Sequence, residues 1–168
     1  MSGPDLVLVG APAAGKSTVG ARVAQRAGVG FTDTDVLLSE RLGLSLPEAW
    51  ASLPPTAIAA AEAEVCLAAL TAPGVVALGS GAVADPGIRV ALAGRTVLWL
   101  EVSVAHASRR LGLVALGMDA LLAMRSRLDS LLRERERWYE EVSTLRLDTD
   151  RLTVADAVEG VERLWAGG

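Results

Sequence analysis

The chain has 168 residues, 51% of them hydrophobic, and a formal net charge of −4. This length and apolar content fit a single domain, residues 1–168, with a full buried core, and they exclude a disordered chain. The negative charge gives no general attraction for nucleic acid, and no run approaches the roughly 18 consecutive apolar residues of a membrane helix. The first residues show no signal-peptide pattern and Cys66 is the single cysteine. We therefore expect a cytoplasmic protein with neither a nucleic-acid nor a membrane partner.

Short apolar runs alternate with helical patterns along the chain. In chain order, they predict a strand at 6–9, a helix at 17–26, a strand ending near Thr32, helices at 35–42, from Ser45 and at 56–70, a strand at 74–78, a helix through 88–92, a strand at 96–100, a helix from Ser103 to about 111, a helix at 119–142, a strand at 145–147 and a helix capped by Thr153. Strands separated by helices form parallel sheets covered on both faces. The predicted fold class is therefore α/β, a three-layer α/β/α sandwich with a five-stranded parallel sheet.

Residues 10–17 read Gly-Ala-Pro-Ala-Ala-Gly-Lys-Ser and fit the phosphate-binding pattern G-x-x-x-x-G-K-[ST], with a predicted strand before it and a helix after it. Its glycines allow a tight turn whose N–H groups face phosphate oxygens, and the helix N-terminus adds partial positive charge. Lys16 would reach the β- and γ-phosphates, and the Ser17 hydroxyl would ligate Mg²⁺. The predicted nucleotide-binding residues are Gly10, Ala13, Ala14, Gly15, Lys16, Ser17 and Thr18.

A P-loop alone does not distinguish a kinase from an NTPase switch or motor, but two acidic residues narrow the choice. Asp33 and Asp35 follow the second predicted strand. Because the carboxyl ends of parallel strands form the ligand crevice, both should lie beside the γ-phosphate. One could hold Mg²⁺ through water, and the other could accept the proton of an attacking hydroxyl. The alternative interpretation is that Asp35 is the N-cap of the next helix.

Over nearly its whole length the chain resembles shikimate kinase, a small member of the nucleoside-monophosphate-kinase-like P-loop group. The resemblance rests on the order and spacing of the P-loop at 10–18, the acidic segment 33–35, Glu62, the segment 79–83, Arg109-Arg110, Arg135, Trp138-Tyr139 and the segment 147–150. It implies a fold of the P-loop kinase type and a protein that can work as a monomer. It also implies transfer of phosphate from ATP to the 3-hydroxyl of shikimate, a step toward aromatic amino acids.

The resemblance also implies roles for individual residues. Lys16 and Asp35 would be catalytic, with Asp35 binding the reacting hydroxyl, and Asp33 would lie on the magnesium side with Ser17. Arg110 would contact the nucleotide at the base of a lid, roughly residues 111–124, and helices within about 34–70 would bind substrate. Arg135 would pair with the shikimate carboxylate, unless it is simply a surface residue of a mixed-charge helix. The implied substrate-binding residues are Asp35, Gly79, Ser80, Gly81 and Arg135.

Two positions and one segment of the chain depart from the family's pattern. Ala59 stands where a second carboxylate-binding arginine is usual, so Glu62 loses its partner. Ser80 replaces the middle of three glycines, and its hydroxymethyl group either adds a hydrogen bond or crowds the pocket. The lid segment 112–118 contains no cation where the family carries an arginine, a position that Arg125 or Arg127 could reach over to fill.

These observations give one leading hypothesis and two alternatives. The leading hypothesis is a kinase that uses ATP and Mg²⁺ to phosphorylate shikimate. The first alternative keeps the kinase chemistry but takes another small hydroxylated metabolite, because an acceptor without a carboxylate would not need two arginines. The second is a nucleotide-binding homologue without kinase activity that serves as a partner or regulatory subunit, which the missing lid arginine favours.

Overall fold

The computed structural model describes residues 3–115 and 117–168, which contain five strands and eight α-helices. The strands are β1 (Leu6–Gly10), β2 (Phe31–Asp33), β3 (Val75–Ala77), β4 (Val97–Glu101) and β5 (Leu145–Asp148). The helices are α1 (Lys16–Ala27), α2 (Thr34–Leu42), α3 (Leu46–Ser52), α4 (Pro55–Ala69), α5 (Pro86–Leu92), α6 (Val104–Arg110), α7 (Met118–Val142) and α8 (Val154–Gly167), with 3-10 turns η1 (Ala82–Ala84) and η2 (Leu113–Ala115). The predicted elements are confirmed, with ends that differ by about two residues or less.

The strands form one sheet in the order β2-β3-β1-β4-β5, and every neighbouring pair is parallel. The predicted five-stranded parallel sheet is therefore confirmed. All five residues of β1, at the centre of the sheet, are buried, as expected when helices cover both faces. Within the described residues, no helix combines the length and the apolar character needed to span a bilayer.

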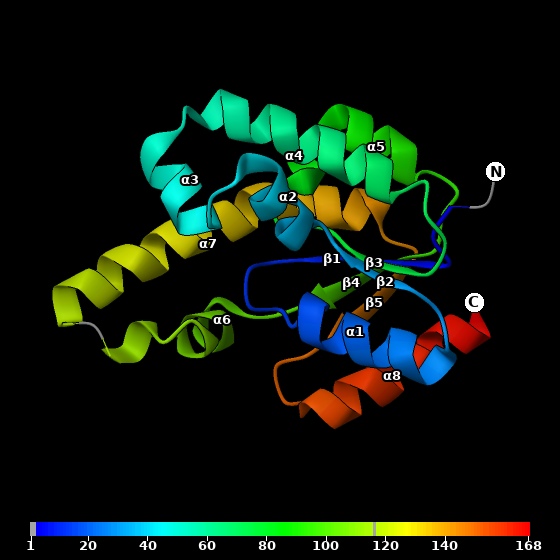
Figure 1. Cartoon of the computed structure of the whole chain (residues 1–168). Helices are drawn as coiled ribbons and strands as arrows, with labels where there is room; N and C mark the ends of the chain where they lie inside the picture. The colour runs from blue at the N-terminus through cyan, green and yellow to red at the C-terminus, as the bar shows by residue number, and fades with distance from the viewer. Residues whose placement is uncertain (1–2, 116) are drawn as a thin grey trace.

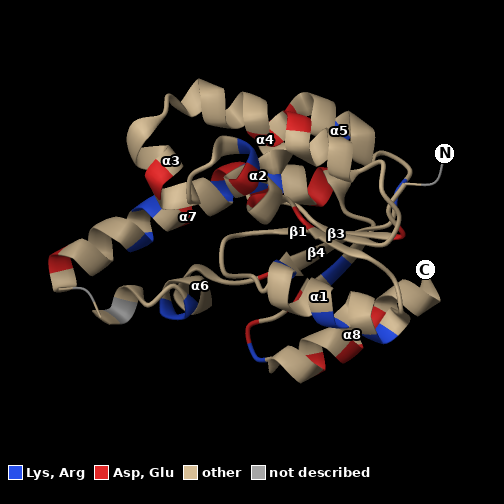
Figure 2. Cartoon of the chain, viewed as in Figure 1, with Lys and Arg blue, Asp and Glu red and all other residues tan. Residues whose placement is uncertain are grey.

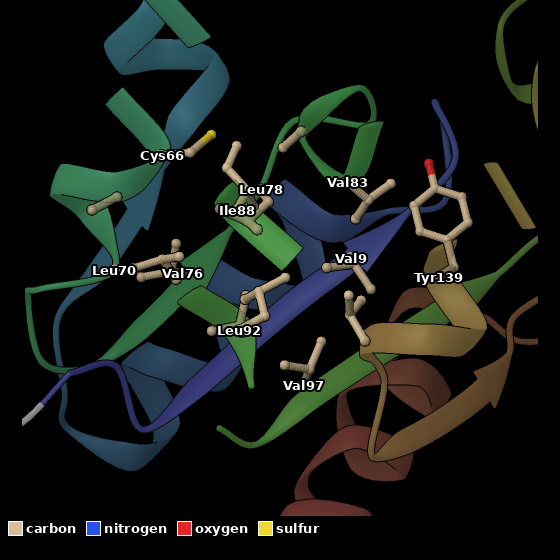
Figure 3. Close-up of a cluster of buried hydrophobic side chains, with 14 of the residues drawn as sticks. Val9, Cys66, Leu70, Val76, Leu78, Val83, Ile88, Leu92, Val97 and Tyr139 are labelled. Carbon is tan, nitrogen blue, oxygen red and sulfur yellow. The ribbon is translucent and has the colours of Figure 1, made fainter. Parts of the chain in front are cut away.

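The two faces of the sheet carry separate apolar clusters, because successive side chains of a strand point to opposite sides. Val7 and Val9 belong to a cluster with residues of α4, α5 and α7, drawn in Figure 3. Leu6 and Leu8 pack instead with residues of α1 and α8. Figure 1 shows the resulting layers, with α4, α5 and α7 above the sheet and α1 and α8 below it. This arrangement confirms the α/β/α sandwich.

Side-chain caps fix where several helices begin. Ser45 and Glu48 form the expected capping box at α3, and Ser103 and Thr153 cap α6 and α8. The cap of α2 decides against the alternative interpretation of Asp35. The N-cap of α2 is Asp33, whose carboxylate accepts a hydrogen bond from the Asp35 N–H at 2.9 Å. The side chain of Asp35 is therefore not used as the cap of this helix.

Candidate active site

The loop between β1 and α1 is shaped by backbone conformations and contacts that favour glycine. Gly15 has φ of +93° at the N-cap of α1, a region that residues with a Cβ rarely adopt. At Gly10 the backbone approaches β4 so closely that a Cβ would collide with the carbonyl oxygen of Leu100. Ala13, with φ of +63°, adopts the same left-handed region without being glycine. The loop thus holds a tight turn at the N-terminus of α1, a geometry that suits a phosphate group.

Lys16, the single lysine of the chain, is buried inside this loop. Its ammonium group donates hydrogen bonds to the carbonyl oxygens of Gly10 at 2.8 Å and Ala11 at 3.0 Å. Burial lowers the pKa of Lys16 to about 8, although the carboxylates of Asp35 and Asp33 oppose this shift. The ammonium group therefore lies on loop carbonyls, beside the place where the sequence predicts bound phosphates.

A cleft of about 340 Å³ opens beside the P-loop, and predicted residues from three parts of the chain line it. Its lining includes Lys16, Ser17, Thr18, Asp33, Asp35 and Ser80. Ser17 is exposed and Asp33 is partly exposed. These hard oxygen donors suit Mg²⁺, which usually binds one or two protein groups together with substrate phosphates. Residues 3–115 and 117–168 contain no group of three or more His, Cys, Asp or Glu side chains that could hold a metal ion.

A second cleft of about 330 Å³ lies on the other side of the P-loop, lined by Ala13, Ala14, Gly15 and Arg110 together with residues around Thr149. Arg110 donates hydrogen bonds to the carbonyl oxygen of Ala13 at 3.1 Å and to that of Thr149 at 2.7 Å. It therefore connects the P-loop to the segment between β5 and α8. The sequence predicts Arg110 as a nucleotide contact, whereas Thr149 lies in the matching segment 147–150 without a predicted role.

Two carboxylates converge on the backbone that follows β3. A Cβ at Gly79 would lie 2.6 Å from Asp35 Oδ1 and 2.7 Å from Glu62 Oε1. The N–H of Gly79 donates to the hydroxyl of buried Thr34 at 2.8 Å, which holds this backbone against α2. Burial raises the pKa of both carboxyl groups, and the charge of Asp35 raises that of Glu62 further. The absence of a side chain at Gly79 is what allows these two groups to approach.

Arg135 of α7 reaches the same backbone segment from the other side. Its Nη1 donates to Ser80 Oγ at 3.2 Å, and the Tyr139 hydroxyl donates to the Ser80 carbonyl oxygen at 2.7 Å. A Cβ at Gly81 would lie 3.3 Å from Glu62 Oε2 and 3.6 Å from Arg135 Nη2. Ser80 thus forms a hydrogen bond to Arg135, so the first of the two possibilities left open for its hydroxymethyl group holds.

The expected second arginine has no substitute on α4. Ala59 is exposed, and Figure 2 shows α4 as an almost uncharged ribbon, with Glu62 and Glu64 as its acidic residues. The expected lid, residues 111–124, includes residue 116, which lies outside the described residues. Arg125 and Arg127 are exposed on α7, beyond the cation-free segment. The structure brings the P-loop, the carboxylates and Arg135 to one edge of the sheet, but no lid cation with them in the part of the chain it describes.

Comparison with known proteins agrees with this geometry. A family model described as shikimate kinase matches residues 12–164. A curated shikimate kinase of Mycobacterium avium (strain 104) is 43% identical over 152 residues, or 88% of this chain and 85% of the relative. That of Thermobifida fusca (strain YX) is 42% identical over 159 residues, covering 94% and 92%.

Among solved structures, the shikimate kinase from Acinetobacter baumannii in complex with shikimate has a TM-score of 0.84. The alignment covers 98% of this chain and 93% of that one at 22% identity, which establishes the shared fold. The family model extends from within the P-loop into α8. Taken together with the sheet topology, they show that the chain belongs to the shikimate kinase family.

Proposed function

We propose that the protein transfers the γ-phosphate of ATP to a hydroxyl of shikimate, giving shikimate 3-phosphate and ADP. The observation that carries the proposal is one cleft in which Lys16 and Ser17 of the P-loop face Asp35, in a chain 43% identical to shikimate kinases. The proposal includes a monomeric, cytoplasmic enzyme that requires Mg²⁺ and uses no nucleic-acid partner. It also includes a single domain with a lid at about 111–124 and substrate-binding helices within about 34–70.

The P-loop supports the phosphates of ATP in this proposal. Its N–H groups and the N-terminus of α1 attract phosphate oxygens. Lys16 exchanges its hydrogen bonds to the carbonyl oxygens of Gly10 and Ala11 for hydrogen bonds to the β- and γ-phosphates. Because the ammonium group already lies on the loop, it needs to move only a short way to reach them. Negative phosphate charge also favours the protonated amine, which offsets the burial that lowers the pKa of Lys16 to about 8.

Ser17 and Asp33 are the residues that would hold Mg²⁺. When bound, the ion neutralises part of the charge on the phosphate oxygens. Asp33 has a further task of its own, because its carboxylate accepts the N–H of Asp35. This hydrogen bond fixes the first turn of α2, and with it the position of the Asp35 side chain relative to the P-loop.

The shikimate-binding side of the site supplies a general base, Asp35, and a residue that binds the shikimate carboxylate, Arg135. The hydroxyl oxygen of shikimate attacks the γ-phosphorus as the bond from that phosphorus to the β–γ bridging oxygen breaks. The hydroxyl proton passes to the carboxylate of Asp35, whose raised pKa makes it a better base than an exposed aspartate. Arg135 pairs with the carboxylate of shikimate, and Gly79 and Gly81 let the ring approach the backbone.

The experiment that tests the proposal measures ADP release from MgATP with and without shikimate. We expect shikimate-dependent turnover that falls about 10²–10³-fold in Lys16→Ala, because a donor to the developing phosphate charge is lost. Nucleotide binding is measured separately, as protection of the single lysine from acetylation. Protection of Lys16 by nucleotide without any stimulation of ADP release by shikimate would contradict the proposal. It would favour another phosphate acceptor, which Ala59 suggests, or a homologue without kinase activity, which the cation-free lid segment suggests.

A further inference from the structure

Ser80 contacts α7 through both its side chain and its backbone. Its hydroxyl accepts a hydrogen bond from Arg135 and its carbonyl oxygen accepts one from Tyr139. Arg135 and Tyr139 are four residues apart on α7, so their side chains lie on the same face of that helix. Ser80 is therefore hydrogen-bonded at two points, its hydroxyl and its carbonyl oxygen, to neighbouring side chains of one helix.

The Tyr139 end of this contact is rigid. The side chain is 2% exposed, and its ring lies 5.6 Å from that of Trp99. In Figure 3 the ring projects from α7 beside Val9 and Val83, with the hydroxyl at its far end. A buried tyrosine that packs in the core and donates one hydrogen bond loses little freedom when it binds the loop. The position of the Ser80 backbone, from which the hydroxyl projects, is consequently held by the core of the molecule.

The Arg135 end carries a guanidinium charge that has the carboxylate of Glu62 nearby but forms no salt bridge with it. The carboxylate of Glu62 and the guanidinium of Arg135 both border the space above Gly81. Nevertheless, within residues 3–115 and 117–168, no carboxylate oxygen lies close enough to Arg135 to form a salt bridge. One N–H group of the guanidinium donates to the hydroxyl of Ser80, which is an uncharged acceptor. A neutral acceptor orients the group and leaves its charge available to an anion.

We propose that Ser80 is a positioning residue that holds the guanidinium of Arg135 toward the carboxylate of the acceptor and away from Glu62. The inference rests on the proposed function, because it assigns the acceptor's carboxylate to Arg135. Ala59 stands in place of the second arginine that the family resemblance implies on α4. An oriented guanidinium presents its planar fork of donors in one direction, which suits a bidentate pair with a carboxylate. Ser80 thereby compensates in part for the second arginine and selects acceptors that carry a carboxylate.

The test is a double-mutant cycle between Ser80 and Arg135, measured by steady-state kinetics. Ser80→Ala should raise the KM for shikimate about tenfold, as expected for a lost hydrogen bond to a charged group. It should leave kcat and the KM for ATP nearly unchanged. Ser80→Thr retains the hydroxyl and should restore most of the affinity. In an Arg135→Gln background, Ser80→Ala should have no further effect on the KM for shikimate. Arg133→Gln, on the exposed part of the same helix, serves as the control background. There the tenfold effect of Ser80→Ala should persist.

The outcomes separate this inference from the proposed function. The inference is overturned if Ser80→Ala changes kcat or the KM for ATP as much as the KM for shikimate. It is also overturned if the effect of Ser80→Ala is the same with and without Arg135. If the wild-type protein does not phosphorylate shikimate, the proposed function fails, and the cycle is repeated on the dissociation constant of shikimate measured by calorimetry with MgADP present. Coupling there supports the inference, and its absence or a lack of shikimate binding overturns it.

Discussion

The nucleotide side and the acceptor side of the cleft satisfy their charged groups differently. On the nucleotide side, Lys16 and Arg110 donate hydrogen bonds to backbone carbonyls of the P-loop. On the acceptor side, Asp35 and Glu62 are half-buried side by side over Gly79, and neither forms a salt bridge within the described residues. On the first side, backbone carbonyl oxygens satisfy the charged groups, whereas on the second side two half-buried carboxylates stand without a salt-bridge partner among the described residues. Function therefore conflicts with stability mainly on the acceptor side.

The largest expected effect comes from Asp35→Asn, which should lower turnover and raise stability together. Loss of the proton acceptor should reduce kcat by about 10²–10⁴-fold. Because the pKa of Asp35 in the folded protein lies above its ordinary value of 3.8, the folded state binds more protons than the unfolded state between these two values. Stability therefore falls as pH rises through that window, and at pH 7 the penalty is fully present. Removing it should raise the melting temperature by about 2–4 °C for each kcal/mol gained.

Thermal unfolding and acceptor-dependent ADP release at pH 7 measure the two effects on the same preparation. Asp129→Asn is the matched control, since Asp129 pairs with Arg133 on the exposed surface of α7, where such a pair contributes about 0.3–0.5 kcal/mol. The control should keep full activity. A loss of stability in Asp35→Asn would mean that the carboxylate stabilises the fold, and the contrast between the two sides would then be wrong.

Arg110→Gln should affect the nucleotide side alone. The change removes the hydrogen bonds to Ala13 and Thr149 that connect the P-loop to the segment after β5. We expect the KM for ATP to rise about 10- to 100-fold, as charged hydrogen bonds of this kind are lost, while the KM for shikimate stays within about twofold. Arg109→Gln changes the preceding residue, which is also exposed, and should leave both constants unchanged. An equal rise in both constants would show that the two sides are not separable.

The sequence predicted those parts of the site that depend on local patterns. The P-loop follows from eight consecutive residues, and Asp33 and Asp35 follow from their place at the end of a strand. By contrast, the contacts of Ser80 join positions 55 and 59 residues apart, and no local pattern specifies which helix of the sandwich covers the loop after β3. The hydrogen bonds of Lys16 to the loop were missed for another reason, because the P-loop pattern describes the loop with phosphate bound.

Two buried threonines, Thr34 and Thr149, stand in the matching segments 33–35 and 147–150 but were assigned no role from the sequence. Thr34 and Thr149 each follow a strand and each stand between two aspartates. Their side chains are 1% and 2% exposed, and a buried hydroxyl requires a hydrogen-bond partner. Thr34 accepts from Gly79, and Thr149 donates to the carbonyl oxygen of Glu101 at 2.7 Å. The repeated Asp-Thr-Asp pattern at strand ends therefore marks residues that hold neighbouring loops in place.

Ala59→Arg is the smallest expected effect and the one that improves the protein. The site is exposed and lies one helical turn before Glu62 on α4, so an arginine there can pair with Glu62 and with the acceptor's carboxylate. The KM for shikimate should fall about tenfold, as expected for one added charged hydrogen bond, and the KM for ATP should stay constant.

Ala60→Arg is the control. It places the same charge on the next residue, also exposed, which points about 100° further around the helix. If both variants lowered the KM equally, general attraction between positive charge and the acceptor would explain the result. A decrease confined to Ala59→Arg would show that the acceptor side lacks one specific cation, whereas no decrease would mean that Arg135, as Ser80 holds it, already meets the whole requirement of the carboxylate.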